Sequence, residues 1–171
     1  MPKALEGTTS PASKNTKKEK NTAMALHTRY GFDCWYDWRV KNWSTKWDIA
    51  DTYGKPEVLK NGKTIEFGFD SAWAPPVGAY EHWLSKNPKF SIRATYHEPG
   101  CDFMGIWDNG EDICYEISTI APKGSVDNFW SSQDGKELDD LYGITENMAQ
   151  YEAEQEADRI GDNKEIIDYS K

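Results

Sequence analysis

The hydrophobic pattern divides the middle of the chain into a mixed series of helices and strands. Apolar residues at spacings of three and four predict helices over 31–43 and from Pro75-Pro76 to Asn87-Pro88. Apolar and polar residues alternate in five other runs, and this alternation predicts strands, because successive strand side chains point to opposite faces. These runs cover 45–52, 64–73, 90–98, 103–107 and 113–117. Asn61-Gly62 separates the first two and is a strong hairpin signal.

This order of elements predicts an α+β fold. We expect a two-layer sandwich in which helices cover one face of a largely antiparallel sheet. The expected domain extends over residues 25–120. Residues 1–24 are rich in Ser, Thr, Lys, Gly and Pro, and they contain almost no large apolar side chain. They cannot bury enough surface to offset the entropy of ordering, so we expect a disordered basic arm.

The last part of the chain, residues 121–171, is expected to be acidic and partly helical. Lys136 to Tyr142 predicts a short helix closed by Gly143, and Thr145 is expected to cap a second helix that extends to about Ile160. The apolar stripe of this second helix is thin. Such a helix either docks weakly on the domain or folds on a partner.

Charge is distributed unevenly along the chain. The net charge of −9 combines +3 over residues 1–24, zero over 25–107 and −12 over 108–171. The acidic third repels phosphate, which disfavours direct nucleic-acid binding. The same charge favours a partner protein with a basic surface. Within the predicted second helix, Glu152, Glu154 and Glu156 are candidate binding residues.

Cysteines, apolar runs and motifs exclude several classes of protein. The three cysteines, at 34, 101 and 114, are odd in number and have no CxxC spacing, so neither a disulfide framework nor a four-cysteine zinc site is expected. The longest apolar run is too short for a membrane span, and a cytoplasmic location is expected. The chain has no nucleotide-binding or hydrolase motif. We therefore predict no catalytic residue, no metal and no cofactor, and an enzyme is not favoured.

Four of the eight tryptophans lie between Trp35 and Asp48. In one interpretation these indoles fill a core between the first helix and the first strand, because each aromatic side chain buries about 150–250 Å². In the other, Trp35, Trp38 and Trp43 stay exposed with Arg39 and form a binding hot spot or a stacking platform. Nearby aspartates weaken the case for nucleic acid.

A second candidate site combines Asp70 and Trp73 with His97. Asp70 and Trp73 stand at the end of a predicted strand, where the following helix N-terminus can accept an anion. Simple strand-to-helix geometry explains the same residues without a ligand. His97 and Glu98 are adjacent in a strand and point to opposite faces, so they do not form a catalytic pair.

Three stretches also resemble a known family. "YGFDCWYDWRVKNWSTKWD", "FDSAWAPP" and "YHEPGCDFMGIWDNGE" occur in that order and resemble the YubB-type ferredoxin-like domain, which includes the Api92-like group of phage and plasmid accessory proteins. The resemblance covers about residues 30–117. It implies a two-layer α+β domain and a mobile-element setting, but no reaction and no iron–sulfur cluster. The N-terminal half common in that family is replaced here by the basic arm, and the acidic end has no counterpart.

These observations lead to three hypotheses about function. The first is a non-enzymatic phage or plasmid accessory protein that binds a host or phage protein with a basic surface and inhibits a host defence protein. The second is an acidic DNA mimic that inhibits a nucleic-acid-directed defence system. The third is a small enzyme or ligand-binding protein with an aromatic cleft between Trp73, the following helix and His97. The sequence does not fix the oligomeric state.

Overall fold

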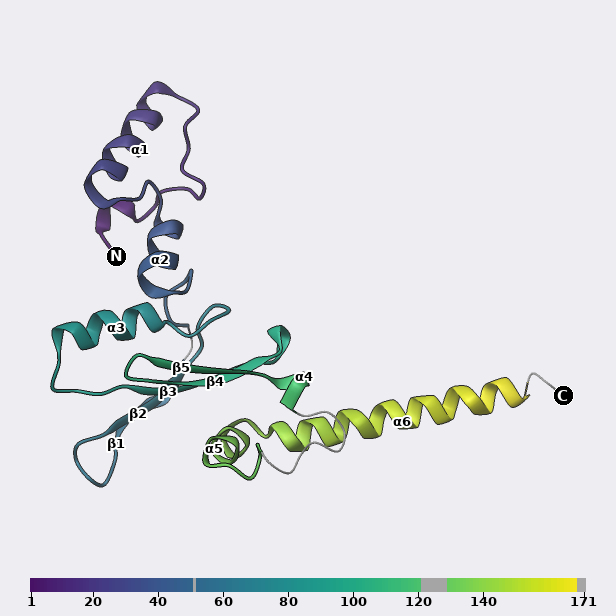
Figure 1. The fold of residues 1–171 in the computed structure, drawn as a ribbon. Coiled ribbons are helices and arrows are strands. Elements are labelled where there is room, and N and C mark those ends of the chain that lie inside the picture. The colour runs from purple at the N-terminus through teal and green to yellow at the C-terminus, as the bar shows by residue number, and fades with distance from the viewer. Residues whose placement is uncertain (51, 121–128, 169–171) are drawn as a thin grey trace. The chain divides into compact units, whose positions relative to one another are not determined.

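The chain folds into two small β-sheets, several short helices and one long C-terminal helix (Figure 1). The computed structural model describes residues 1–50, 52–120 and 129–168, with side-chain surroundings as far as residue 160. The helices are η1 (Lys3–Leu5), α1 (Lys17–Tyr30), α2 (Trp35–Trp43), α3 (Val77–Lys86), η2 (Pro99–Cys101), α4 (Ile117–Ile120), α5 (Gln133–Tyr142) and α6 (Ile144–Asp168). The strands are β1 (Thr52–Val58), β2 (Ile65–Phe69), β3 (Arg93–Glu98), β4 (Phe103–Asp108) and β5 (Glu111–Glu116).

The predicted α+β class is confirmed, whereas the ferredoxin-like sandwich stays a prediction. The strands form a two-stranded sheet, β1-β2, and a three-stranded sheet of order β3-β4-β5. The chain divides into two compact units. Unit 1 comprises Met1–Arg93 and Trp107–Glu111, and unit 2 comprises Ala94–Ile106 and Asp112–Lys171. Among the described residues, no helix combines the length and the apolar character that crossing a membrane requires.

Helix α1 lies partly where the sequence predicted a disordered arm. Its first turn contains a capping box, in which the backbone N–H of Glu19 donates to Thr16 Oγ1 at 3.2 Å and the N–H of Thr16 donates to Glu19 Oε2 at 2.8 Å. These two bonds satisfy donors that a helix start otherwise leaves unpaired. Gly31 ends the helix at a φ of 78°, which glycine adopts without steric cost. The expected boundary at residue 24 therefore falls inside a helix, and the expected arm includes two buried side chains, Leu5 and Ala23.

Helices α2 and α3 pack together in unit 1 through a close backbone approach at Gly78. The N–H of Gly78 donates to Ser44 Oγ at 3.1 Å, and a Cβ at this position would lie 2.7 Å from the carbonyl oxygen of Asn42. The predicted helix after Pro75-Pro76 is confirmed, with Asn87 as its C-terminal cap. Only a residue without a side chain fits this contact.

The β1–β2 hairpin differs from the prediction in where its first strand begins. The turn at Asn61-Gly62 is confirmed, since Gly62 has a φ of 65° and the side chain of Asn61 accepts from the N–H groups of Lys63 and Thr64. The first strand, however, begins at Thr52, where the predicted run 45–52 ends. Thr45 is instead buried, and its hydroxyl donates to the Ala72 carbonyl at 2.8 Å.

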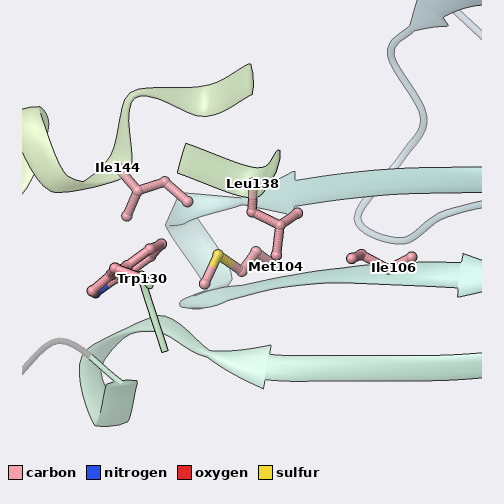
Figure 2. Close-up of a cluster of buried hydrophobic side chains, with 5 residues drawn as sticks. All are labelled: Met104, Ile106, Trp130, Leu138 and Ile144. Atoms are coloured by element: carbon pink, nitrogen blue, oxygen red, sulfur yellow. The ribbon is translucent and has the colours of Figure 1, made fainter. Parts of the chain in front are cut away.

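The main hydrophobic cluster lies in unit 2, where α5 and the start of α6 pack on β4 (Figure 2). Its buried members are Met104, Ile106, Trp130, Leu138 and Ile144. The predicted helix closed by Gly143 is confirmed, since Gly143 caps α5 with a φ of 60°. The predicted cap at Thr145 is wrong in detail. Helix α6 begins one residue earlier, and the N–H and hydroxyl of Thr145 both donate to the carboxylate of Asp139.

The tryptophan-rich segment is not the buried core that one interpretation expected. None of the residues of α2, all of which the structure describes, is fully buried, and Trp47 is 56% exposed. The indoles that are buried among the described residues are Trp107 and Trp130. The reason is local: the aromatic positions of the short helix α2 lie close together on its surface, so its rings contact one another and the Arg39 guanidinium.

Candidate functional site

Helix α2 brings the four residues of the predicted indole–cation site together in unit 1. Trp35, Arg39 and Trp43 are four residues apart, so they share one helix face. The Arg39 guanidinium carbon lies 5.4 Å from the Trp35 ring centroid and 4.9 Å from that of Trp43. Trp38 meets Trp43 edge to face, with centroids 5.7 Å apart. Cation–π contacts of this kind are worth about 0.5–1 kcal/mol each at exposed sites.

The ends of α2 hold this face in place. The backbone N–H of Trp35 donates to Thr8 Oγ1 at 2.9 Å, which ties the helix start to the N-terminal segment. Ser44 closes the helix in a left-handed conformation, and its N–H donates to the Val40 carbonyl at 3.2 Å. Within the described part of the chain, the buried Nε of Arg39 has no hydrogen-bond partner. The guanidinium is therefore held mainly by the indole faces.

A second indole–cation group lies next to α2, at Lys46, Trp47 and Trp73. Lys46 Nζ lies 4.3 Å from the Trp47 ring centroid and 5.2 Å from that of Trp73. Both indoles are more than half exposed. Of these three residues only Trp73 is a site residue predicted from the sequence. The Lys46-Trp47 pair lies in an alternating run, which favours a strand over a binding site.

Asp70 and Trp73 do not form a common site. Asp70 accepts a hydrogen bond from the Tyr53 hydroxyl across the β1–β2 hairpin, and Trp73 turns to Lys46. An anion site at the start of α3 stays a prediction.

His97 lies in unit 2, on β3, whereas Trp73 lies in unit 1. The His97 ring centroid is 5.0 Å from that of Tyr142. Burial lowers the pKa of His97, and the nearby charge of Glu98 opposes this effect. Burial raises the pKa of Tyr142, whose hydroxyl donates to Thr95 Oγ1 at 3.1 Å. His97 is thus a half-buried ring in a packed environment, and the cleft expected between Trp73 and His97 stays a prediction.

One group of side chains in the described residues has metal-ligand chemistry. Ligand atoms of Asp33, Cys34 and Asp37 lie within 4.8 Å of one another at the start of α2. Their hydrogen bonds and charges are already engaged, since Lys14 Nζ lies 2.7 Å from Asp33 Oδ2 and the Cys34 thiol donates to Asp37 Oδ2 at 3.2 Å. The Lys14 ammonium also lowers the pKa of Asp33. One of the three possible ligands, Asp33, is thus already paired with an ammonium.

The acidic candidates lie on helix α6, which begins in the core of unit 2 and then leaves it. Ile144 is buried and Met148 packs against the cluster, but every residue from 151 to 160 is exposed. This exposed run includes the predicted residues Glu152, Glu154 and Glu156. Their local partners are few: Gln150 Nε2 donates to Glu154 Oε1 at 2.9 Å, and Arg159 pairs with Glu156 at 2.8 Å.

Carboxylates repeat along this helix at positions that face one another. Glu152 and Glu156 are four residues apart, and so are Glu154 and Asp158. Like charges at this spacing destabilise a helix by about 0.2–0.5 kcal/mol per pair. The exposed part of α6 therefore has unfavourable self-repulsion and little apolar packing to offset it.

Comparison of the chain with protein-family models, curated proteins and solved structures gives no match. The YubB-type resemblance accordingly stays a prediction.

Proposed function

We propose that the protein acts by protein–protein interaction and that the acidic part of α6 binds a basic surface on its partner. The observation that supports this most directly is the exposed run from residue 151 to 160, which has four carboxylates and one basic side chain. Every residue of this run is exposed, so its side chains are accessible to a partner along the whole stretch.

The electrostatics of α6 favour a cationic partner. Lysine or arginine side chains placed beside the two like-charged pairs would convert repulsion into attraction and would stabilise the helix at the same time. Complementary charge also accelerates association and excludes acidic competitors. Because the surface is polar, the interaction should weaken as salt screens it, with a Debye length of about 8 Å at physiological ionic strength.

The resemblance to phage and plasmid accessory proteins suggests what the interaction achieves. A basic host protein, such as a component of a defence system, is the partner that this setting favours. No chemistry is required of the protein in this proposal, since occupying the partner's surface is sufficient to inhibit it. The setting also supports action in the cytoplasm of the host cell.

A second candidate function, mimicry of DNA, is favoured by the spacing of the carboxylates. Glu152, Glu154, Glu156 and Asp158 follow one another at every second residue. At a rise of about 1.5 Å per residue, this gives one charge per about 3 Å of helix axis when both faces of the helix are counted. One strand of B-DNA has one charge per about 3.4 Å. A DNA-binding protein is then the basic partner, and its DNA site is the surface that α6 occupies.

The test is a capture experiment from a bacterial lysate with quantitative mass spectrometry. The first variant neutralises the exposed carboxylates of α6 through Glu152→Gln, Glu154→Gln, Glu156→Gln and Asp158→Asn. A control variant removes the same number of charges from exposed positions in other elements, through Glu57→Gln, Glu66→Gln, Glu81→Gln and Glu111→Gln. Both variants have the same net charge, so they differ only in where the charge is lost.

We expect the α6 variant to lose a partner that the wild type and the control both retain. Equal loss in the two variants would mean that net charge alone governs capture, and retention in both would exclude α6; either result refutes the proposal. Duplex DNA added to the captured complex separates the two candidate functions. Release of the partner by DNA supports mimicry, whereas a complex that persists supports another basic surface.

A further inference from the structure

We propose that the outer edge of β2 pairs with β2 of a second copy of the chain, which joins two β1–β2 hairpins into a four-stranded antiparallel sheet. The inference begins with the size of the hairpin sheet. Within the described residues it has two strands, and β1 is exposed along its whole length. Such a sheet is marginally stable in water, and three or more strands are generally needed.

One face of the hairpin is apolar and open to solvent. Val58 is paired with Ile65, so the two side chains share a face, and Phe67 and Phe69 follow on the same side of β2. Val58, Ile65 and Phe67 are 66%, 63% and 49% exposed. The Phe67 and Phe69 rings lie 5.7 Å apart. The apolar side chains thus form a row along one face of the hairpin, in which the Phe67 and Phe69 rings are in contact.

The opposite face of the hairpin carries Tyr53 and the charged side chains. The ring of Tyr53 packs over Gly68, where a Cβ would lie 3.0 Å from a ring carbon. The Tyr53 hydroxyl donates to the carboxylate of Asp70. Glu57 and Glu66 face each other on this side, so the charges lie away from the apolar face. The contrast indicates that the apolar face, and not the polar one, would gain from contact with a second molecule.

The two edges of the hairpin are not equivalent. The pairing shifts register between Tyr53 and Glu57, and this irregular stretch contains Pro56, which has no N–H to donate. Bulges and prolines are features that prevent an edge from pairing. Strand β2 is regular, and within the described part of the chain β1 is its only neighbour in the sheet.

The backbone pattern of β2 identifies the groups on its open edge. The N–H of Leu59 donates to the carbonyl of Thr64, so Thr64 directs its polar groups toward β1. Direction alternates along an antiparallel strand. Ile65, Phe67 and Phe69 therefore direct their N–H and C=O groups outward.

A two-fold axis through Phe67 matches these outward groups with those of a second copy. Antiparallel pairing about this point places Phe67 opposite Phe67 and Ile65 opposite Phe69, and it forms about six backbone hydrogen bonds. Aromatic–aromatic and aromatic–β-branched pairs are stabilising cross-strand pairs. Glu66 falls opposite Gly68, so no like charges meet. The sequence Ile65–Phe69 is in this sense complementary to itself, which favours a second copy over an unrelated partner.

Disulfide trapping tests both the dimer and its register. The background replaces the exposed cysteines through Cys101→Ser and Cys114→Ser and keeps the buried Cys34. In this background Phe67→Cys places two thiols across the two-fold axis, with Cα atoms about 5.5 Å apart, within the range that a disulfide spans. The matched control, Ile65→Cys, is on the same strand and face, but its two copies would lie about 13 Å apart.

We expect mild oxidation to give covalent dimer with Phe67→Cys and monomer with Ile65→Cys. In sedimentation equilibrium the wild type should show a dimer whose dissociation constant rises at least about tenfold in Phe67→Lys, because the two lysines would face each other. A wild type that stays monomeric at every concentration refutes the proposal, as does equal trapping at both positions. Circular dichroism of the reduced Phe67→Cys variant checks that the hairpin is intact, so that absent trapping also counts against it.

Discussion

The close approach of α2 and α3 at Gly78 predicts an unusual response to alanine. In an open helix, replacing glycine by alanine stabilises the fold by as much as about 1 kcal/mol. Here the added Cβ would lie 2.7 Å from the carbonyl oxygen and 3.0 Å from the carbonyl carbon of Asn42. Both are backbone atoms at the end of a helix, so neither can move aside as a flexible side chain would.

The magnitude follows from the competition between these two effects. Overpacking a close contact costs about 1–3 kcal/mol, and separating the helices would also weaken the bond from the Gly78 N–H to Ser44 Oγ. After subtraction of a gain in helix propensity of about 1 kcal/mol, Gly78→Ala should lower the free energy of unfolding by up to about 2 kcal/mol, and the weakened hydrogen bond adds to this loss.

Urea denaturation followed by circular dichroism measures this change. His82→Ala is the control, because His82 is exposed on the same helix and alanine has the higher helix propensity. The control should match or exceed the stability of the wild type. A Gly78→Ala protein as stable as His82→Ala would refute the close backbone packing of α2 against α3.

Two further predictions concern unit 2. Leu138→Ala removes a fully buried side chain from the main hydrophobic cluster and should lower the free energy of unfolding by about 2–5 kcal/mol in a urea titration. Leu141→Ala, on the exposed side of α5, should lower it far less. Equal losses would contradict the assigned core. Burial beside Tyr142 lowers the pKa of His97 below its ordinary value of 6.5, so the unfolded chain binds this proton more readily. The stability that neutral His97 contributes is therefore fully present above pH 6.5 and lost as the pH falls through the lower pKa of the folded state. His97→Gln should flatten this part of a stability profile measured by urea denaturation between pH 7 and 5, and an unchanged slope would show that another group is responsible.

Local sequence signals predicted the elements whose ends are set by local chemistry. Pro75-Pro76 and Asn87 bracket α3, Asn61-Gly62 forms the hairpin turn, and Gly143 ends α5. In each case the residue's own backbone preference or hydrogen bonding fixes where the helix or turn lies, so the local sequence is sufficient to predict it.

Signals failed where tertiary contacts decide the outcome. Alternation around Trp47 favours a strand from Thr45, but the Thr45 hydroxyl bonds to the Ala72 carbonyl and the strand begins only at Thr52. The strand formed instead through Pro56, a residue that argues against strands, because a register shift accommodates it. For the same reason the sequence predicts the Arg39 contacts but not the Lys46 contacts. Arg39 meets its rings through helical spacing, whereas Lys46 meets Trp73 through a contact between distant parts of the sequence.

Trp73 shows what such a contact demands of the backbone. It has a φ of 66°, a left-handed conformation that costs a residue with a Cβ about 1–3 kcal/mol. Glycine would relieve this strain, but it would remove one of the two indole rings that contact the Lys46 ammonium. Glycine at this position would therefore exchange backbone strain for the loss of a cation–π contact. The contact with Lys46 accounts for the presence of a tryptophan in a turn that glycine would form more easily.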